Sequence, residues 1–524
     1  MHDHFLQKSN DVICSKDILK ALKADNFLYL RGVDITEYLS ADASLLEKRS
    51  RVLRDTAEVP GLHALVDEWI AQITYLSEMV KKKSEHASGE ESLYSVKQLE
   101  LYFSIVDTTC AYAEEHAAAC TSSEYQTLFE AFLRIADTEY NQLKVKTKKL
   151  LDQISQIKSI SIGFNFDASL TPYEAGILSV NQRYIESGTL IDRLLRGDTG
   201  QEYCSIAPLV VSKRQIGSGE FDVLEHALYT GIDKLFKKQL RQWEPEILTF
   251  LQNRLGFLLD ILPDLQFISE ITAISERMRS AGLQLCKPEY SVFDTCTSEL
   301  CGFYHPVLAL NFAEHRESTE NTIVKNDITF DQNGMLYILT GPNNGGKSVY
   351  LSAVVLIQLM AQLGMMVPAE KAVLTPVHGI FVHFPKHGSL HEMGRLAEEC
   401  ETIAAIFSAL PKRKSAPALV VMDEAFSSTD AKDAIQLSDT VLRALSHCRV
   451  RGIYATHFHE LYEYAEAANA ARGPDDSPID YLVAGIDKNE TRTYRIERRK
   501  PDGKSYAQTI AQKYGILYET LIQI

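Results

Sequence analysis

The feature that most constrains this chain is a glycine-rich octapeptide between an apolar run and an apolar helical pattern. The run covers residues 335–340 (MLYILT), and the helical pattern begins near Val349. The octapeptide fits G-x-x-x-x-G-K-[ST] and reads Gly341-Pro342-Asn343-Asn344-Gly345-Gly346-Lys347-Ser348. In a strand–loop–helix context such a loop binds phosphate, because its backbone N–H groups surround the anion and the helix N-terminus adds partial positive charge. We therefore expect all eight residues to bind a nucleoside triphosphate.

A second apolar run ends in two carboxylates and complements this loop. Residues 418–424 read ALVVMDE. We expect Lys347 to reach the β- and γ-phosphates, while Ser348 and Asp423 bind Mg²⁺. Glu424, one residue further on, is placed to polarise the attacking water. Adjacent carboxylates can also simply end a strand, but their combination with the loop favours chemistry, with ATP and Mg²⁺ as cofactors.

A third short run, residues 451–455 (RGIYA), precedes a histidine-containing segment. Ligands of open α/β sheets bind just beyond the carboxyl ends of parallel strands. His457 is therefore predicted to sense the γ-phosphate, which completes a catalytic set of Lys347, Glu424 and His457. Other histidines could suggest a further metal, but their spacing fits neither H-E-x-x-H nor another zinc pattern, so we expect no metal besides Mg²⁺. They are His378, His383, His387, His391 and His459.

The remainder of the chain is predominantly helical in pattern. At 524 residues the chain is too long for one hydrophobic core. Residues 11–160 carry helical spacing, residues 161–197 carry turn signals, and helical spacing returns over 219–282 with expected breaks at Pro245 and Pro263. From about residue 286, strand-like runs alternate with helical segments, which is typical of an α/β sheet.

Composition places the chain among ordinary globular proteins, with 45% hydrophobic and 24% charged residues. No window approaches 18 uninterrupted apolar residues, and the start MHDHFLQKSNDV lacks the pattern of a signal peptide. We therefore expect a cytoplasmic protein with no membrane partner. The 9 cysteines include no C-x-x-C pair, which indicates reduced structural thiols.

The formal net charge of −16 bears on partners. Proteins held on nucleic acid by phosphate contacts usually present a basic face, so this average charge opposes non-specific binding. The best basic clusters are Lys81–Lys83 and the run Lys144, Lys146, Lys148 and Lys149. Each can equally be a solvated helix face.

Together these residues resemble the MutS family of ABC-type ATPases. The matching segments are His305–Val307 (HPV) with Val324–Ile328 (VKNDI), the loop GPNNGGKS, Met422–Ala425 (MDEA), Ala455–Leu461 (ATHFHEL) and Ser505–Ala507 (SYA). The resemblance is strong over about 290–524 and weak before that. It implies an α/β P-loop NTPase domain of the ABC/MutS type, preceded by a mainly α-helical core and lever region. The expected divisions are a helical core and lever at 1–150, a junction module with returning lever helices at 151–284, and the ATPase domain at 285–524.

The resemblance also implies how the domain would work. Asn326 would lie near the adenine, and two protomers would form a head-to-tail homodimer with nucleotide between them. The partner's signature loop, here Gly394–Glu399, would close on the γ-phosphate. Leu396 stands where the family has a serine hydroxyl. We hypothesise that Arg395 or backbone N–H groups take over that contact.

The predicted function is that of a dimeric ATPase clamp that couples ATP binding and hydrolysis to DNA engagement through the phosphate backbone, in repair or recombination. Classical mismatch reading is not expected, because the sequence shows no N-terminal mismatch-reading domain and Phe312-Ala313-Glu314 reads as a chance match to its wedge motif. Two alternatives stay open. One is an ATP-driven protein-interaction switch, which the acidic charge favours, and the other is an ATPase that engages ribosomes or RNA.

Overall fold

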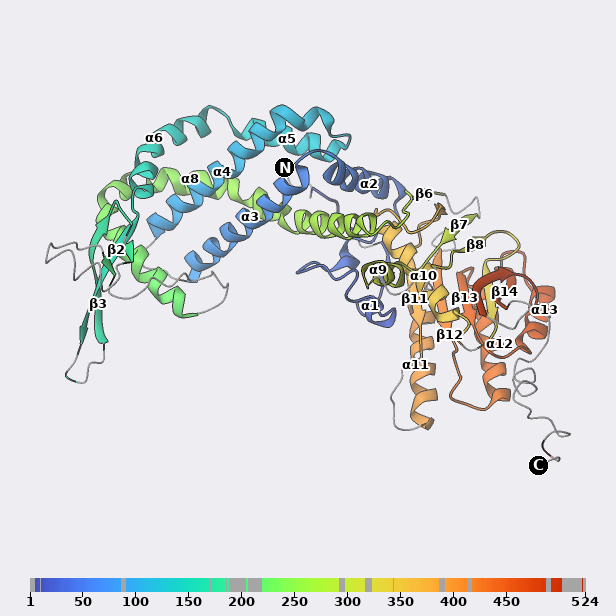
Figure 1. Ribbon diagram of the computed structural model, residues 1–524. Helices are drawn as coiled ribbons and strands as arrows, with labels where there is room; N and C mark the ends of the chain where they lie inside the picture. Colours follow the sequence, from blue (N-terminus) through green and yellow to red (C-terminus); the bar gives the residue numbers. More distant parts are fainter. Residues whose placement is uncertain are drawn as a thin grey trace. The chain divides into compact units, whose positions relative to one another are not determined.

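The computed structural model divides into two compact units (Figure 1). Unit 1 comprises Met1–His2, Asp67–Ala119 and Tyr125–Leu262, and unit 2 comprises Asp3–Val66, Cys120–Glu124 and Pro263–Ile524. The structure describes residues 5–9, 11–85, 91–166, 168, 172–184, 186–187, 204–205, 219–291, 297–315, 323–342, 344–385, 392–411, 417–486, 492–501 and 521.

Unit 1 is mainly helical, as the sequence predicted. Its helices are most of α3 (Leu62–Glu85), α4 (Glu91–His116), η2 (Ala117–Ala119), most of α5 (Ser123–Ile135), α6 (Thr138–Ser155) and the first part of α8 (Gly219–Ser280). The core forms around Trp69, whose ring stacks on Phe132 with centroids 5.9 Å apart. The Trp69 indole N–H donates to the hydroxyl of Thr109 at 2.8 Å, so its polar atom is satisfied inside the core.

The turn-rich segment predicted at 161–197 contains a β-hairpin. Strands β2 (Ser159–Phe166) and β3 (Pro172–Asn181) pair antiparallel, with register shifts between Ser161 and Ile162 and between Asn165 and Phe166. Short strands β4 (Glu186–Ser187) and β5 (Cys204–Ser205) form a separate parallel pair. The expected non-helical module is thus confirmed where the structure describes this segment.

Helix α8 corrects one prediction, because it runs unbroken over 62 residues through both Pro245 and Pro263. A proline inside a helix removes one N–H donor and crowds the preceding turn. Apolar residues at helical spacing are nevertheless buried after Pro245 and on both sides of Pro263: Ile247, Phe250, Leu251, Leu265, Ile268 and Ile271. Burial of this continuous face outweighs the lost hydrogen bonds, so the helix persists.

Unit 2 is built on a seven-stranded sheet with the order β1-β11-β12-β13-β9-β14-β15. Its strands are β1 (Ile13–Cys14), β9 (Leu336–Thr340), β11 (Gly379–His383), β12 (Ala418–Asp423), β13 (Arg451–Ala455), β14 (Ile479–Ile486) and β15 (Arg492–Arg498). Only the β14–β15 pair is antiparallel among these described strands. The predicted strands at 335–340, 418–422 and 451–455 are confirmed as β9, β12 and β13. All three are buried throughout, as expected of apolar runs in a parallel sheet.

Helices cover both faces of this sheet. Helix α10 (Lys347–Gln362) is almost wholly buried and packs against β12 and β13. On the other face, α11 (Glu392–Ala409), α12 (Ala431–His447) and α13 (Leu461–Ala471) share an apolar core with alternate strand residues, such as Val420 and Met422 of β12. The result is a three-layer α/β/α arrangement, a mixed α/β sheet of the kind that was predicted.

Smaller elements complete unit 2. A second sheet has the order β6-β10-β7-β8, and α9 follows β7 along the chain. Their bounds are β6 (Glu289–Tyr290), β7 (Ser298–Phe303), α9 (Pro306–His315), β8 (Asn326–Phe330) and β10 (Lys371–Leu374). The N-terminal segment adds α1 (Ile18–Ala21), η1 (Ile35–Glu37) and α2 (Ala43–Glu58), while β1 pairs in parallel with β11.

A buried polar cluster ties the N-terminal segment to the rest of unit 2. Asp264 on α8 accepts hydrogen bonds from the Leu6 N–H and the Tyr38 hydroxyl, each at 2.8 Å. The Arg49 guanidinium donates to the carbonyls of Tyr38 and Gln7. Hydrogen bonding to buried charged groups is a strong constraint, since leaving such a group unsatisfied is costly. Residues 3–66 therefore fold as part of the sheet-containing unit. The domain ranges expected from the sequence did not indicate that these distant segments join.

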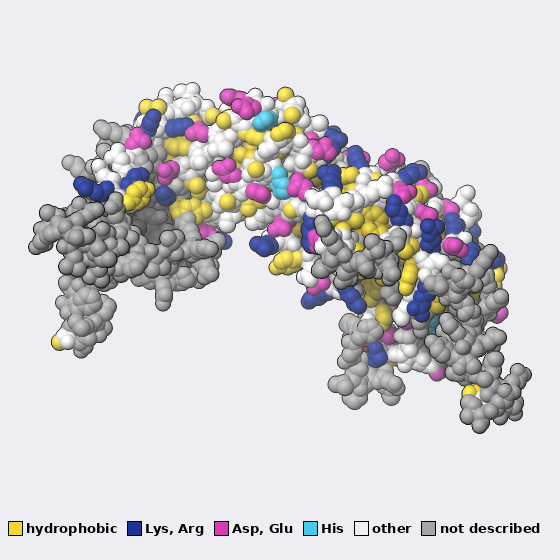
Figure 2. All heavy atoms as spheres, in the orientation of Figure 1, with side chains coloured by type: hydrophobic (Ala, Val, Ile, Leu, Met, Phe, Trp, Pro, Cys, Tyr) yellow, Lys and Arg dark blue, Asp and Glu magenta, His cyan; other side chains and the backbone are white. Residues whose placement is uncertain are grey.

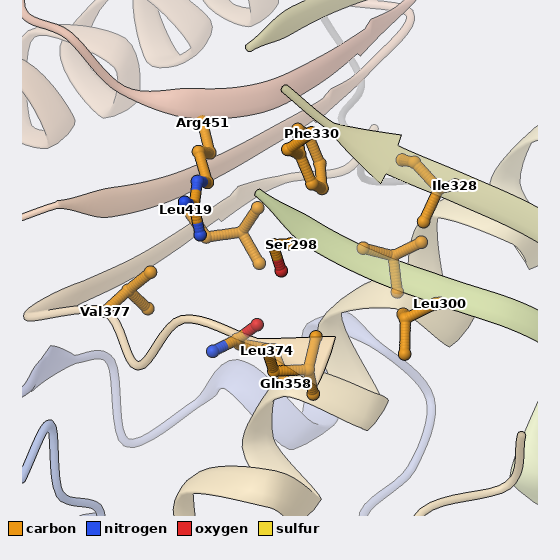
Figure 3. A pocket seen from close by; sticks show the side chains of 10 residues that line it. Ser298, Leu300, Ile328, Phe330, Gln358, Leu374, Val377, Leu419 and Arg451 are labelled. Carbon is orange, nitrogen blue, oxygen red and sulfur yellow. The ribbon is translucent and has the colours of Figure 1, made fainter. Parts of the chain in front are cut away.

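A small internal cavity of about 10 Å³ lies between the two sheets and α10 (Figure 3). Gln358 and Arg451 border it together with apolar side chains that include Leu419 and Val354. About 10–15 Å³ is the minimum space for one water molecule. This cavity is therefore a packing void and offers no room for an organic ligand.

None of the helices in the described ranges combines the length and apolar character that a membrane crossing requires. The cysteines whose side chains are described, among them Cys14 and Cys120, carry free thiols. Burial raises the pKa of Cys14 to about 12 and that of Cys120 to about 11, so these thiols are protonated at neutral pH and poorly nucleophilic.

Two glycines allow a matched test of packing in unit 2. Gly364 follows α10 with φ +85°, and Gly282 follows α8 with φ +77°. Both helix ends have the same closing hydrogen bond, from the N–H of the next residue to the carbonyl five residues earlier. A Cβ at Gly364 would lie 2.8 Å from the Arg49 Cβ, whereas a Cβ at Gly282 would meet open space.

Gly282→Ala should therefore lower the free energy of unfolding by about 1 kcal/mol, the cost of a left-handed alanine. Gly364→Ala should lower it by about 2–4 kcal/mol, because steric overlap with α2 is added. Denaturant unfolding of the two variants and the parent measures the difference. Equal destabilisation would contradict the close packing of α2 on the end of α10.

Candidate functional site

The glycine-rich loop, residues 341–348, connects β9 to α10 and is shaped by its glycines. Gly341 has φ +144°, and a Cβ there would lie 2.5 Å from the Ala484 side chain of β14. Gly346, at the start of α10, has φ +89°, and Asn344 has φ +58°. The loop therefore needs residues without a side chain at its closest approach to the sheet. Asn343, also predicted to bind nucleotide, lies outside the described residues.

Lys347 is held inside this loop. Its Nζ atom donates to the carbonyls of Gly341 at 2.9 Å and Pro342 at 3.2 Å, and lies 3.9 Å from Glu424 Oε1. Burial lowers the pKa of Lys347, while the charges of Glu424 and Asp423 raise it. A buried ammonium with two neutral acceptors and nearby carboxylates is suited to exchange these contacts for phosphate oxygens.

The predicted Mg²⁺ ligands are neighbours. The Ser348 hydroxyl is hydrogen-bonded to the Asp423 carboxylate, which is 3% exposed. Burial raises the pKa of Asp423, and the bond from Ser348 opposes that rise. Asp423 Oδ1 is buried without a hydrogen-bond partner among the described residues. A hydroxyl beside an unsatisfied buried carboxylate oxygen is a donor set that fits Mg²⁺, whose other ligands would be phosphate oxygens and water.

Glu424 sits on a strained turn directly after β12. Its φ is +45°, and its N–H donates to the Ala455 carbonyl of β13 at 2.9 Å. Its side chain is 33% exposed and lines the same cavity as Lys347. An ionised carboxylate at the mouth of the site can accept a proton from a water molecule, so the geometry suits the predicted base.

His457 is less closely associated with the site. It follows β13 two residues after Ala455, which pairs with Asp423 in the sheet. Its side chain is exposed and its ring contacts Phe458 with centroids 4.1 Å apart. Among the described residues that line the cavity, His457 is not included. Its role as a γ-phosphate sensor therefore stays a prediction.

A cavity of about 930 Å³ joins the loop to an apolar chamber. Lys347, Ser348, Asp423 and Glu424 line its polar end. The rest of its lining is mostly apolar or aromatic and comes from α9 and the residue before it, from residues before β8, and from β15: His305, Leu308, Phe312, Ile323, Val324 and Tyr494. A polar end and an apolar remainder suit a ligand that combines phosphates with a flat ring.

Asn326 lines the cavity but uses its side chain to join two strands. Its Oδ1 accepts from the Ile496 N–H at 2.7 Å, and its Nδ2 donates to the Tyr494 carbonyl at 3.3 Å. Tyr494 itself has φ +55° and lies beside Gly346. Asn326 thus holds Tyr494 at the edge of the site. The sequence did not indicate this contact between Asn326 and Tyr494.

His305 is anchored by two hydrogen bonds. Its Nδ1 accepts from the Leu308 N–H at 3.3 Å, and its Nε2 lies 3.2 Å from the Ser352 hydroxyl. Ser352 in turn donates to the Leu22 carbonyl at 3.4 Å. With Nδ1 accepting, the proton of the neutral ring is on Nε2 and is donated to Ser352. Burial lowers the pKa of His305 to about 4, so the ring is neutral at pH 7.

The segment Gly394–Glu399 corrects another prediction. It was expected to be a loop, but it lies in the first turns of α11. Leu396 packs against the apolar core beneath α11, α12 and α13, so its side chain contributes to the packing of its own unit. Glu399 accepts the Phe426 N–H at 2.9 Å, just beyond the carboxylate pair. Helical i, i+7 spacing is the signal that could have indicated this, since Leu396, Ile403 and Leu410 recur at that interval and so fall on one face.

Other site residues were missed or misread at the sequence level. Phe312 was read as part of a chance motif, yet its ring lines the cavity, while Glu314 forms an ion pair with Arg277. Leu308 and Phe312 are four residues apart on α9 and therefore share one face. Tyr494 carries no local signal, because only strand pairing brings β15 to the loop. The predicted segment Ser505–Ala507 lies outside the described residues.

Comparison with known proteins agrees with this geometry. Residues 337–518 match the family model for MutS domain V. This C-terminal part of the chain is thus similar to MutS domain V. The chain is 29% identical over 268 residues to the DNA mismatch repair protein MutS of Chlorobium phaeobacteroides, covering 50% of this chain and 28% of that protein. It is 29% identical over 281 residues to DNA mismatch repair protein MutS 1 of Halobacterium salinarum, covering 52% and 29%.

A further relative is DNA mismatch repair protein MutS of Solibacter usitatus, at 34% identity over 173 residues, 32% of this chain and 19% of that protein. The matches therefore span less than a third of the length of these relatives. The resemblance to the MutS family is confirmed for residues 337–518, which include the glycine-rich loop and both carboxylates.

His305 makes the stability of unit 2 depend on pH. A histidine whose pKa is about 4 when folded and about 6.5 when unfolded binds its proton more readily in the unfolded chain. Its contribution is complete above pH 6.5 and is lost as the pH falls toward 4, because protonation favours unfolding. Between pH 7 and pH 5 the loss should be about 2 kcal/mol.

His305→Asn supplies the comparison, because asparagine can accept the Leu308 N–H but does not titrate. The parent should be the more stable protein at pH 7, and its advantage should shrink by about 2 kcal/mol at pH 5. Denaturant unfolding of both proteins at the two pH values measures this. A difference that stays constant between pH 7 and pH 5 would mean that His305 is not buried in its neutral form.

Proposed function

We propose that this protein is a MutS-type ATPase that binds ATP and Mg²⁺ in the 930 Å³ cavity and hydrolyses ATP to ADP and phosphate. The observation that carries the proposal is the convergence of Lys347, Ser348, Asp423 and Glu424 at the polar end of that cavity. A phosphate-binding loop alone is a common pattern, but here an ammonium, a metal-binding pair and a carboxylate base share one space. This is the set of groups that phosphoryl transfer to water requires.

The chain's own residues divide the work of binding. Lys347 exchanges its loop carbonyls for the β- and γ-phosphate oxygens, and the N–H groups of Gly341–Ser348 surround the anion. Ser348 and Asp423 would hold Mg²⁺, which would neutralise part of the charge on the phosphates. The apolar chamber beside Phe312 and Tyr494 receives the base.

Hydrolysis then depends on Glu424 and, in this proposal, on His457. Glu424 orients a water molecule and accepts its proton as the water attacks the γ-phosphate. The turn after β12 supports this role, since it presents the carboxylate to the cavity rather than continuing the strand. His457 donates a hydrogen bond to the transferred phosphoryl group as negative charge develops.

Dimerisation completes the proposed site, with a second copy of the chain bringing its Gly394–Glu399 segment toward the γ-phosphate. Leu396 cannot donate a hydrogen bond and packs on its own core. Arg395 or backbone N–H groups at the start of α11 supply the contact instead, as a positive charge given in trans does in other phosphoryl-transfer enzymes. ATP binding closes the dimer and hydrolysis reopens it, which moves the helical region.

The proposed output is engagement of DNA through its phosphate backbone. The relatives named above are DNA mismatch repair proteins, which supports DNA as the target. The net charge of −16 supports a second candidate, an ATP-driven switch that binds another protein. On the face seen in Figure 2, Lys and Arg side chains are interspersed with Asp and Glu, so DNA contacts would rely on local basic clusters.

Two substitutions test the nucleotide chemistry. Lys347→Ala should weaken ATP binding more than 10-fold, because the loop loses its charge-assisted contact to the phosphates. Glu424→Gln should bind ATP like the parent but turn it over at least about 100-fold more slowly, because the amide cannot accept a proton. Equilibrium nucleotide binding and steady-state phosphate release measure the two effects. Parental turnover by Glu424→Gln would show that another group is the base.

The output is tested with Glu424→Gln and ATP·Mg²⁺ on labelled linear, mismatched and branched DNA over a salt series. A clamp should bind only with ATP and should weaken steeply as salt rises, because phosphate contacts release counterions. Lys347→Ala is the control and should show no ATP-dependent binding. No DNA complex at low salt, with hydrolysis intact in the parent, would favour the protein switch or a ribosomal target.

A further inference from the structure

The turn that presents Glu424 is held in an unfavourable backbone conformation. Glu424 has φ +45° and Phe426 has φ +62°. Left-handed φ values are uncommon for residues other than glycine, and for a bulky residue such as phenylalanine they are true outliers. Each costs on the order of 1 kcal/mol or more, so neighbouring groups must hold the turn in place.

Three contacts hold this turn. The Glu424 N–H donates to the Ala455 carbonyl, and the side chains of Ala425 and Phe426 are buried in the core below α11 and α12. The third contact comes from a side chain: Glu399 Oε2 accepts the Phe426 N–H at 2.9 Å. Glu399 lies 27 residues before Phe426 in the chain and belongs to α11.

This third contact is stronger than an ordinary hydrogen bond. A carboxylate that accepts a backbone N–H in a partly buried site gives a charge-assisted bond. Burial raises the pKa of Glu399, and both the Phe426 N–H and the charge of Arg395 oppose that rise. The carboxylate therefore interacts favourably with the turn in its ionised form.

We propose that Glu399 is a positioning residue for hydrolysis, which acts by fixing the Phe426 N–H and thereby the direction of the Glu424 carboxylate. This inference rests on the proposed ATPase function and deepens it. Helix α11 would then have two roles. Its first turns would contact the nucleotide bound by the partner subunit, and Glu399 would position Glu424 of its own chain. Binding of α11 to the partner's nucleotide would thereby affect the position of Glu424 in the same chain as that helix.

The test compares Glu399→Ala with Glu399→Gln. Alanine removes the acceptor and should lower kcat about 10- to 100-fold, the range expected from a small misplacement of a reacting group. The affinity for ATP should be unchanged, since Glu399 is not among the described residues that line the cavity. Glutamine keeps a carbonyl oxygen that accepts the Phe426 N–H, so its kcat should stay within about 3-fold of the parent. Glu401→Ala is the matched control, an exposed carboxylate on the same helix, and should leave turnover unchanged.

Amide hydrogen exchange of the segment 424–430 provides a second readout that does not require hydrolysis. Exchange should be faster in Glu399→Ala, because the Phe426 N–H loses its acceptor, and parental in Glu399→Gln. Unchanged exchange in Glu399→Ala would overturn the proposal, as would an equal loss of kcat in both variants. If the parent hydrolyses no ATP, the proposed function fails, and hydrogen exchange still decides whether Glu399 holds the turn.

Discussion

The parallel pairing of β12, β13 and β9 is the constraint on which the rest of unit 2 depends. Asp423 pairs with Ala455, and Ala455 pairs with Leu339, one residue before the end of β9. Parallel strands end at the same edge of a sheet, so the loop after β9 and the carboxylates at the end of β12 meet there. The strands can be placed this way because each is an apolar run that is buried on both faces.

Strain is concentrated at that edge. Asn344, Glu424, Phe426 and Tyr494 all have positive φ values although none is glycine. Backbone strain persists only where surrounding structure over-determines it, and here the surroundings are a rigid sheet and buried helices. The well-packed core of unit 2 thus stabilises a set of conformations that no short peptide would adopt. In return, the site presents Lys347 and Glu424 in fixed directions.

Helix α10 extends this order away from the site. It begins at Lys347 and is buried almost to its end, where Gln362 donates to the Ser40 carbonyl at 2.9 Å and Gly364 lies against Arg49. The Ser40 and Arg49 contacts belong to the same N-terminal segment that meets Asp264 on α8. Contacts at both ends of α10 thus connect the glycine-rich loop, the N-terminal segment and the part of α8 that belongs to unit 2.

Local sequence determined the elements and the chemical identity of the site. The runs that became β9, β12 and β13, the glycine-rich loop, and the hydroxyl and carboxylates at strand ends were all readable from residue order, because each depends on a few consecutive residues. The helix breaks expected at Pro245 and Pro263 were wrong for a related reason: proline is a local signal, and burial of the continuous apolar face of α8 overrides it. Gly394–Glu399 was likewise misread as a loop, although its apolar spacing continues that of α11.

Only the tertiary structure decided which distant residues meet. Residues 3–66 join the sheet-containing unit through β1 and through the hydrogen bond of Tyr38 to Asp264, although their own pattern indicates nothing more than helices. Asn326 holds Tyr494 at the cavity across 168 residues of chain, and Glu399 reaches Phe426 across 27. Such contacts depend on strand pairing and helix packing over the whole unit. The free energy of one hydrogen bond is too small to impose a recognisable pattern on the neighbouring residues in the sequence. The sequence therefore determined which polar and charged side chains the chain offers, and the packing of the sheet decided which residues hold those side chains in place.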